Sequence, residues 1–340
     1  MNKIVHENSR LKKLENLADT FAKASISEAT KKAYQTDWRD FWSFCRDNDL
    51  HYLPADSDTI CLYLTSLAES GISVATIVRR CTSITAIHNA SGFDSPIKSD
   101  KVGRVLRGIR NTLGYLPKKS KALSWSEVTR LSAQCGSLML GLRNAAILLF
   151  GWASALRRSE LCSINLGDLE ITDEGIVLTI RRSKTDRDGK GEKIGIPRAQ
   201  DASVCPVVAV ERWIQRRSKS ILSEGSADEP LFVKIGVNGR NKWWWETGGR
   251  LSARTISSIV KHYARLSGLN PKLYSAHSLR RGLATEAGSR GVPERIISRH
   301  TRHRSIAVLR GYIEEGTIWE ENPLPAIYTP RSGSITGLDE

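Results

Sequence analysis

The chain has 340 residues, with 51 lysines and arginines against 36 aspartates and glutamates, which gives a formal net charge of +15. This length suits two domains better than one, and a composition of 40% hydrophobic and 26% charged residues excludes wholesale disorder. An isoelectric point near 9.7 favours a polyanionic partner, of which nucleic acid is the commonest.

Membrane insertion and export are not indicated by the sequence. The longest strongly apolar stretch, residues 145–156, is shorter than the roughly 20 residues that a membrane-spanning helix needs. The N-terminus lacks the continuous apolar segment of a signal peptide. The six cysteines are scattered, whereas a disulfide framework or a structural zinc site needs tighter spacing. We therefore expect a soluble, cytoplasmic protein with reduced thiols and no membrane partner.

The N-terminal part of the chain is predicted to be helical. Residues 1–18 are polar and suggest a flexible arm, and residues 19–115 have the periodicity of four amphipathic helices. In the fourth of these helices, apolar residues from Val102 to Leu113 lie opposite a face of lysine and arginine. Residues 116–121, with proline and lysines, are expected to form a linker.

The basic face of this fourth helix is the first candidate site. Between Lys98 and Lys121 there are eight basic residues and one acid, Asp100. A charged face is often only solvated, but a stripe of one sign favours phosphate contact. The residues predicted to contact DNA are Arg79, Arg80, Lys101, Arg104, Arg107, Arg110, Lys118, Lys119, Lys121 and Arg281.

The second domain is expected over residues 122–330, followed by a flexible tail over 331–340. It begins helical, and then residues 176–180 and 193–196 form two β-branched runs on either side of a polar, glycine-containing segment. This arrangement predicts a β-hairpin with a long loop, after which the chain returns mainly to helices. The expected fold class is therefore mainly α with a small β-hairpin or sheet, an α+β fold.

Three short patterns in the second domain carry candidate chemistry. They are residues 155–161 (ALRRSEL), residues 276–282 (AHSLRRG), and His303 followed nine residues later by Tyr312. Each has an ordinary structural explanation when taken alone. An arginine after a helix commonly pairs with a carboxylate, a histidine is commonly a hydrogen-bonded structural residue, and a tyrosine commonly packs in a core.

Taken in order, these patterns resemble the tyrosine recombinase family, also called phage-type integrases, and in particular its two-domain, Cre-like members. The family pattern is an arginine in Leu-Arg-x-x-Glu-Leu, a hairpin lysine, His-x-x-Arg, Gly-His, and a tyrosine nine residues beyond that histidine. The matching residues, which we predict to be catalytic, are Arg157, Lys184, His277, Arg280, His303 and Tyr312. The resemblance spans about residues 25–320.

The chain departs from the family pattern in the segment before the last histidine. Arg302 precedes His303 where the family usually has glycine. His300 is an alternative candidate, but it lies twelve residues before Tyr312, so we prefer His303. Two further lysines compete with Lys184 for the hairpin position, namely Lys190 and Lys193.

The resemblance implies a function. A helical core-binding domain and a catalytic domain would form a clamp around double-stranded DNA that carries a specific recombination site, with inverted repeats flanking a spacer. Tyr312 would attack phosphorus to give a 3′-phosphotyrosine, with Arg157 and Arg280 binding the phosphate oxygens. His277 would accept the tyrosine proton, Lys184 would protonate the leaving 5′-oxygen, and His303 would hydrogen-bond the phosphate.

The same resemblance implies a homo-tetramer on DNA and no cofactor, neither ATP nor metal. Apolar residues after Tyr312 suggest a C-terminal interaction tail that docks in cis or in trans; they are Ile318, Trp319, Leu324, Ile327 and Tyr328. The consecutive tryptophans Trp243–Trp245 either pack a loop or contact DNA sugars. The biological task stays open between integration, excision, dimer resolution and transposition.

Two other functions remain as alternatives. A type IB topoisomerase would use similar residues, and a catalytically silent, sequence-specific DNA-binding regulator would use the same fold. An RNA-binding module is disfavoured because the chain lacks an aromatic RNA-binding motif.

Overall fold

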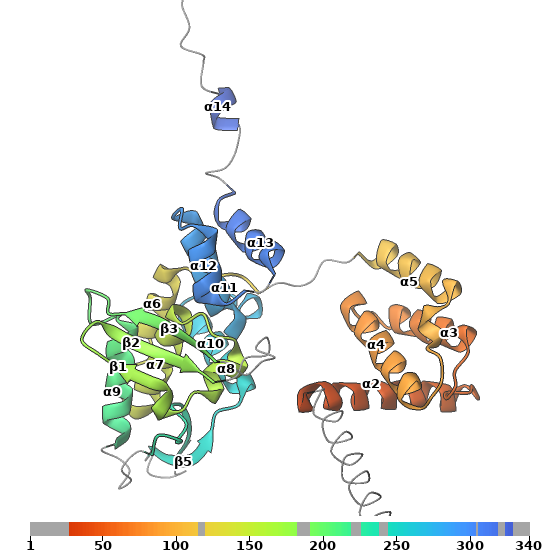
Figure 1. The fold of residues 1–340 in the computed structure, drawn as a ribbon, viewed down its shortest axis with the longest axis horizontal. Coiled ribbons are helices and arrows are strands. Elements are labelled where there is room, and N and C mark those ends of the chain that lie inside the picture. Colours follow the sequence, from red (N-terminus) through yellow and green to blue (C-terminus); the bar gives the residue numbers. More distant parts are fainter. Residues whose placement is uncertain are drawn as a thin grey trace, which may run out of the picture. The chain divides into compact units, whose positions relative to one another are not determined.

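The computed structural model describes residues 27–114, 120–181, 191–218, 226–237, 244–303, 305–318 and 324–328. The chain divides into two compact units, Met1–Lys118 and Lys119–Glu340 (Figure 1). This boundary falls within residues 116–121, the segment predicted as a linker. The predicted arm (residues 1–18) and the predicted flexible tail (residues 331–340) lie outside the described residues.

The first unit is helical throughout its described part. Its helices are α2 (Glu28–Asp47), α3 (Ser57–Glu69), α4 (Val74–Ala90) and α5 (Asp100–Leu113), with a 3-10 turn η1 (Pro96–Lys98) before α5. Each α-helix begins where a serine or aspartate side chain accepts a hydrogen bond from the N–H three residues later; the capping residues are Ser27, Asp56, Ser73 and Ser99. Such caps satisfy N–H groups that the helix itself leaves unpaired.

The core of this unit follows the predicted periodicity. Phe41 from α2, Ile60 and Leu64 from α3, and Ile77 and Ile84 from α4 are fully buried against one another. The first residues of the apolar stripe of α5 close this core, so the opposite, basic face of α5 is left toward solvent.

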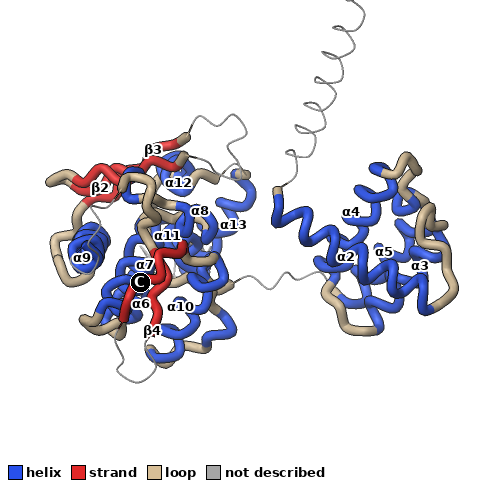
Figure 2. Tube along the Cα trace, turned by 90° about the horizontal axis from the view of Figure 1, so that it is seen from below, coloured by secondary structure: helices blue, strands red, loops and turns tan. Residues whose placement is uncertain are grey.

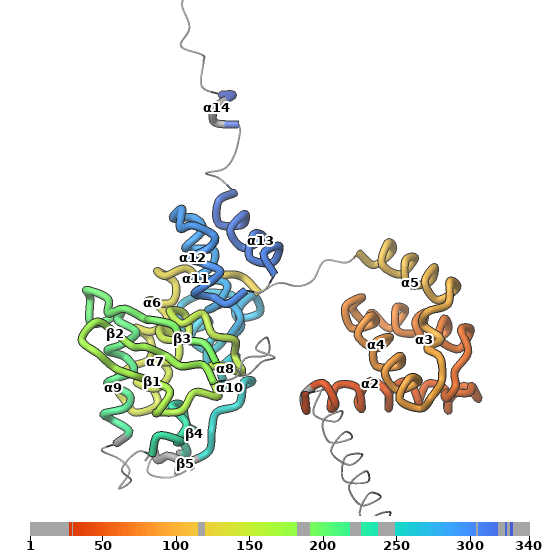
Figure 3. The backbone as a smooth tube through the Cα atoms, viewed as in Figure 1, coloured from red at the N-terminus to blue at the C-terminus, as the bar shows by residue number. Residues whose placement is uncertain are grey.

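The second unit is built around α7 (Met139–Ala153), which is buried along most of its length. Its other helices are α6 (Trp125–Ala133), α8 (Arg158–Ser163), α9 (Pro206–Ser218), α10 (Ala253–Leu266), α11 (Ala276–Ser289), α12 (Glu294–Thr301), α13 (Ile306–Gly316) and α14 (Leu324–Tyr328), with 3-10 turns η2 (Leu166–Asp168) and η3 (Pro271–Leu273). Helices α6, α9 and α11 pack against α7, and α9 also contacts strand β3 (Glu192–Pro197) (Figure 3).

All strands of the described structure lie in the second unit (Figure 2). Strands β1 (Leu169–Ile171), β2 (Gly175–Ile180) and β3 form an antiparallel sheet in that order. The register pairs Ile176 with Ile196 and Leu178 with Ile194, so the predicted hairpin is confirmed.

Two strands were not predicted. Strands β4 (Val233–Val237) and β5 (Trp244–Arg250) form a second antiparallel pair after the hairpin, where mainly helices were expected. The glycines of β5 and the irregular register between Val233 and Ile235 obscure the alternation that normally marks a strand. Trp243 lies outside the described residues.

No helix in the described ranges is long and apolar enough to cross a membrane. The mainly helical α+β fold class is thus the observed one, with small antiparallel sheets confined to the second unit.

A close contact at Gly282 joins α11 to the segment before α6. A β-carbon at Gly282 would lie 1.9 Å from the Leu123 carbonyl oxygen and 2.7 Å from Trp152 Nε1. These two atoms are hydrogen-bonded at 2.8 Å. We predict that Gly282→Ala lowers the free energy of unfolding of the second unit by about 3 kcal/mol, measured by urea denaturation.

The matched control is Gly311→Ala in α13, where an added β-carbon meets nothing within 4 Å. Alanine there is expected to be neutral or to stabilise by up to about 1 kcal/mol, because it restricts the unfolded chain. Equal stability of the two variants would contradict the close packing of α11.

Candidate active site

Tyr312 is held on α13, which packs beside α11 and α12 (Figure 1). Its ring, 8% exposed, joins a small apolar cluster with Ala284, Ile297 and Leu309. Gly288 of α11 lets the helices approach closely, since a β-carbon there would lie 3.0 Å from the backbone of α13. The tyrosine therefore has a fixed position against α11.

The hydroxyl of Tyr312 faces a histidine. His277 Nε2 lies 3.1 Å from the Tyr312 oxygen, within hydrogen-bond distance. The His303 ring is 5.6 Å from the tyrosine ring, centroid to centroid, and the guanidinium carbon of Arg281 is 5.2 Å from the same centroid. This arrangement gives the phenol a proton acceptor within a cationic environment.

Two arginines from separate helices lie in the same site. Arg280 is 2% exposed, and its Nη1 donates to the Ala155 carbonyl at 2.7 Å. Arg157, at the N-cap of α8, is partly exposed and donates from Nη1 to Glu160 Oε1 at 2.7 Å. Burial and the charge of Arg157 lower the pKa of Arg280 to about 10, so the Arg280 guanidinium is still charged at neutral pH.

Glu160 is the counter-charge for these groups. Its Oε2 accepts from the Arg157 backbone N–H at 2.8 Å and from Arg302 Nη2 at 2.7 Å. The side chains of Glu160 and Arg302 are each only 4% exposed. A buried carboxylate with charged partners on both oxygens has little freedom to reorient.

Both site histidines have lowered pKa values. Partial desolvation of the ring lowers the pKa of His277 first, and the charges of Arg280 and Arg281 lower it further. Burial, followed by Arg280 and Arg157, lowers the pKa of His303 to about 3. The imidazole of His303 is therefore neutral at physiological pH, and its Nδ1 lies 2.6 Å from Thr301 Oγ1.

Five of the six predicted catalytic residues are brought together here: Arg157, His277, Arg280, His303 and Tyr312. Lys184 and its alternative Lys190 lie outside the described residues, whereas Lys193 is exposed on β3. His300 is engaged elsewhere, with its Nε2 2.7 Å from the Ala153 carbonyl oxygen. Arg302 had no predicted role, although its place before His303 was a visible signal.

The predicted DNA-contacting residues of α5 fall into two groups. Arg104, Arg107 and Arg110 are exposed, and none has an ion-pair partner within the described ranges. Lys101 is exposed but pairs with Asp58. Three cations of α5 are therefore available to a polyanion.

The other predicted contacts are more constrained. Arg79 pairs with Asp37, and Arg80 pairs with Asp40 and donates to Tyr63 at 2.9 Å. Lys121 is exposed, and Lys118 and Lys119 lie outside the described residues.

Arg281 differs from all of these because it is buried. Its guanidinium donates to the Ser120 carbonyl at 2.8 Å, pairs with Glu315, and lies over the Tyr312 ring. These contacts lie inside the second unit, so they hold α11 and α13 together beside the tyrosine.

The described residues contain no group of three or more His, Cys, Asp or Glu side chains arranged to hold a metal ion. The cysteines within them are free thiols.

Comparison with known proteins places the site in a family. Residues 121–317 match the phage integrase family. The chain is 33% identical over 334 residues to the integrase/recombinase xerD homolog of Selenomonas ruminantium, covering 96% of this chain and 94% of that relative. It is 29% identical over 295 residues to recombinase cre of Escherichia phage P1, covering 82% and 81% respectively.

The fold is also that of a solved integrase. The structure of the Tn1549 transposon integrase in complex with transposon right end DNA superposes with a TM-score of 0.58 at 18% identity. The similarity covers 87% of this chain and 92% of that one.

The lowered pKa of His303 makes stability depend on pH. A histidine with a folded pKa near 3 and an unfolded pKa near about 6.5 binds more protons when unfolded, so stability falls as pH drops through this window. We predict that, below about pH 6, the free energy of unfolding of the unaltered protein falls faster than that of His303→Gln. The difference between the two proteins should grow by up to about 1.4 kcal/mol per pH unit.

The test is urea denaturation of both proteins at several pH values between 7.5 and 4.5. A constant offset between the two stability curves reflects only the substitution itself. Curves that stay parallel over the whole range would contradict a neutral, desolvated His303.

Proposed function

The chain belongs to the phage integrase family, and on this premise we propose that it is a site-specific recombinase that cleaves and rejoins double-stranded DNA through Tyr312. The observation that carries the proposal is the 3.1 Å approach of His277 Nε2 to the Tyr312 oxygen beside Arg157 and Arg280. A tyrosine placed only for packing needs no proton acceptor at its hydroxyl, and that acceptor needs no arginines around it.

The arginines suit a phosphodiester. Its transition state for displacement spreads negative charge over the non-bridging oxygens, and fixed guanidinium groups stabilise that charge with little reorganisation. Arg280 is fixed by the Ala155 carbonyl and Arg157 by Glu160, so both are oriented before substrate arrives. His303, neutral and next to Arg280, is suited to hydrogen-bond the same phosphate.

The proposed cleavage step is balanced in atoms and charge. The Tyr312 oxygen forms a bond to phosphorus, the bond from phosphorus to the 5′-oxygen breaks, and the phenol proton passes to His277. The leaving oxygen takes a proton from a general acid, for which Lys184 remains our candidate from the sequence. The products are a 3′-phosphotyrosine and a free 5′-hydroxyl.

Rejoining is the reverse of this step. The phosphotyrosine keeps the energy of the broken ester, so the 5′-hydroxyl of another strand can displace Tyr312 without ATP. The arginines supply the charge stabilisation that metal ions supply in other phosphoryl-transfer enzymes, so we propose a mechanism that needs no cofactor. A DNA substrate also makes the cytoplasm the compartment that we propose.

The two units would share the binding of DNA. We propose that residues 19–115 form the core-binding domain and residues 122–330 the catalytic domain, and that together they form a clamp around the duplex. The exposed arginines of α5 support a role for the first unit in phosphate contact.

Exchange between two duplexes needs four active sites, and we propose that the chain assembles as a tetramer on its DNA.

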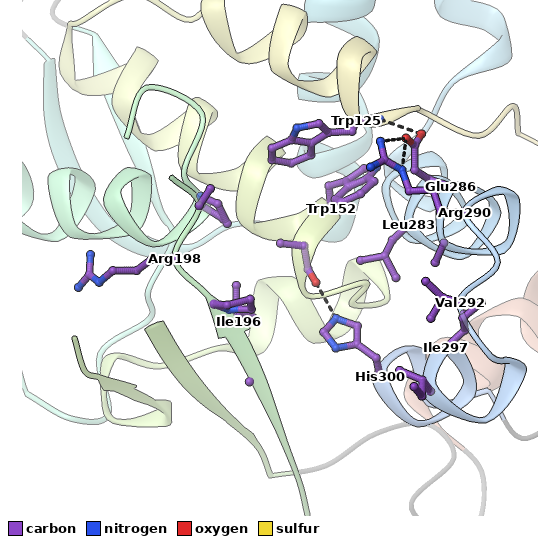
Figure 4. A pocket seen from close by; sticks show the side chains of 17 residues that line it. Trp125, Trp152, Ile196, Arg198, Leu283, Glu286, Arg290, Val292, Ile297 and His300 are labelled. Atoms are coloured by element: carbon purple, nitrogen blue, oxygen red, sulfur yellow. Dashed lines mark hydrogen bonds and ion pairs between the residues drawn. The ribbon is translucent and has the colours of Figure 1, made fainter. Parts of the chain in front are cut away.

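An apolar pocket of about 550 Å³ offers a docking place for the tail of a neighbouring protomer in this assembly (Figure 4). Its lining includes Trp125, Trp152, Leu283, Val292 and Ile297. Beyond α13, Ile318 and the described part of the tail, Leu324, Ile327 and Tyr328, are exposed. We propose that the tail of one protomer occupies this pocket on the next.

The reaction is tested by trapping the covalent intermediate. A binding site is first selected from random-sequence duplexes and then prepared with a nick, so that the released strand diffuses away and the adduct accumulates. We predict a band of protein joined to DNA on a denaturing gel with EDTA present, and none with Tyr312→Phe.

The conservative substitution Tyr312→Phe should bind this site as tightly as the unaltered chain, because only the hydroxyl is removed. Tight, site-specific binding by both proteins with no adduct from either would instead favour the DNA-binding regulator. Rapid relaxation of supercoiled DNA without strand exchange would favour the topoisomerase.

Phosphate contact by α5 is tested by the salt dependence of binding to any duplex of about 30 base pairs. Each phosphate contact contributes about 0.9 to the slope of log K against log salt, so replacing Arg104, Arg107 and Arg110 together with alanine should lower the slope by nearly 3. Lys101→Ala should change it by less than about one, because Asp58 already pairs with this lysine. An unchanged slope in the triple variant would show that these arginines of α5 do not contact DNA phosphates.

A further inference from the structure

Arg302 has a backbone conformation that arginine seldom adopts. It follows the last residue of α12 with φ 55° and ψ 49°, in the left-handed region. The left-handed conformation costs free energy in a residue with a β-carbon, whereas glycine adopts it without strain. The tyrosine recombinase pattern has glycine at this position. The chain thus carries a strained residue directly before His303.

The side chain of Arg302 is also costly to bury. It is 4% exposed, and its Nη1 makes no hydrogen bond with any described residue. Its Nε, 3.4 Å from Glu192 Oε2, forms an ion pair without hydrogen-bond geometry. A buried guanidinium with incomplete hydrogen bonding gains less from its contacts than its desolvation costs, so it does not stabilise the fold. We therefore look for a functional role for Arg302.

The contacts of Arg302 reach both arginines of the active site. Its Nη2 donates to Glu160 Oε2, and the other oxygen of Glu160 holds Arg157 Nη1, each at 2.7 Å. Its carbonyl oxygen is 3.5 Å from Arg280 Nη2, a long hydrogen bond. Without the side chain of Arg302, Glu160 Oε2 would keep the Arg157 backbone N–H as its remaining partner.

We propose that Arg302 is a positioning residue for DNA cleavage, which fixes Glu160 and through it the guanidinium of Arg157, while its carbonyl helps to fix Arg280. This inference rests on the function proposed above. The strained, buried arginine is then useful because it orients the groups that bind the scissile phosphate. The side chain of Arg302 is buried and pairs with Glu160, so in this inference Arg302 acts through Glu160 and not by contact with DNA.

The test separates cleavage from binding and folding. For each variant we would measure the single-turnover rate of adduct formation on saturating nicked site, the Kd for the same site, and the urea midpoint. Arg302→Gly should fold, because glycine suits the left-handed conformation, and should bind DNA with unchanged Kd. Its cleavage rate should fall by about 100-fold, since small displacements of positioning groups have effects of that size.

Two further variants make the result specific. Arg302→Lys should have an intermediate rate, because an ammonium can pair with Glu160 but lacks the planar fork of a guanidinium. Arg295→Ala removes one exposed positive charge from the same helix without touching Glu160, and should cleave at the unaltered rate.

A cleavage rate for Arg302→Gly within about threefold of the unaltered chain would overturn the inference, and so would a parallel loss of affinity, which would indicate direct DNA contact. If Arg302→Gly does not fold, Arg302→Lys decides in the same way: slower cleavage at unchanged Kd supports the role. Absence of any adduct from the unaltered chain would count against the proposed function, and is thereby distinguished from failure of this inference.

Discussion

The carboxylate of Glu160, buried between Arg157 and Arg302, is the interaction on which the site depends. Phosphate binding requires several guanidinium groups close together, and such groups repel one another in a desolvated environment. Burial lowers the pKa of Arg280 most, the charges of Arg157 and Arg302 lower it further through that repulsion, and Glu160 opposes them. One acidic side chain at the start of α8 thus allows a positive site to form inside a folded domain.

Burial and the surrounding positive charge together keep the histidines neutral. Desolvation lowers the pKa of His303 and of His277 most, and the nearby arginines lower it further, so both are available as hydrogen-bonding and proton-accepting groups near neutral pH. For Tyr312, a neutral His277 at 3.1 Å is a better proton acceptor than a charged one. The arginines that suit a phosphate therefore also help burial to keep the proton acceptor of Tyr312 neutral.

Much of this arrangement could be predicted from the sequence because the signals are local. The periodicity of α5 gave its apolar and basic faces, and the β-branched runs gave the β2–β3 hairpin. The order of Arg157, His277, Arg280, His303 and Tyr312 identified residues that the fold brings together across more than 150 positions of the chain.

The remaining features depend on tertiary contacts. Arg281 looked like a DNA contact, yet it is buried by Ser120, Glu315 and the ring of Tyr312, residues that no local pattern connects with it. The role of Arg302 depends on a left-handed backbone and on a carboxylate 142 positions away. The glycines of strand β5 leave its sequence without clear alternation, and its register with β4 is irregular.

We propose above that these charges direct the phenol of Tyr312 to attack a DNA phosphate. The most direct measurement is peptide mapping of the protein–DNA adduct by mass spectrometry after nuclease trimming of the bound strand. We expect a nucleotide joined through its 3′-phosphate to Tyr312, with a free 5′-hydroxyl on the released strand. Attachment at another residue, or linkage through a 5′-phosphate, would contradict it.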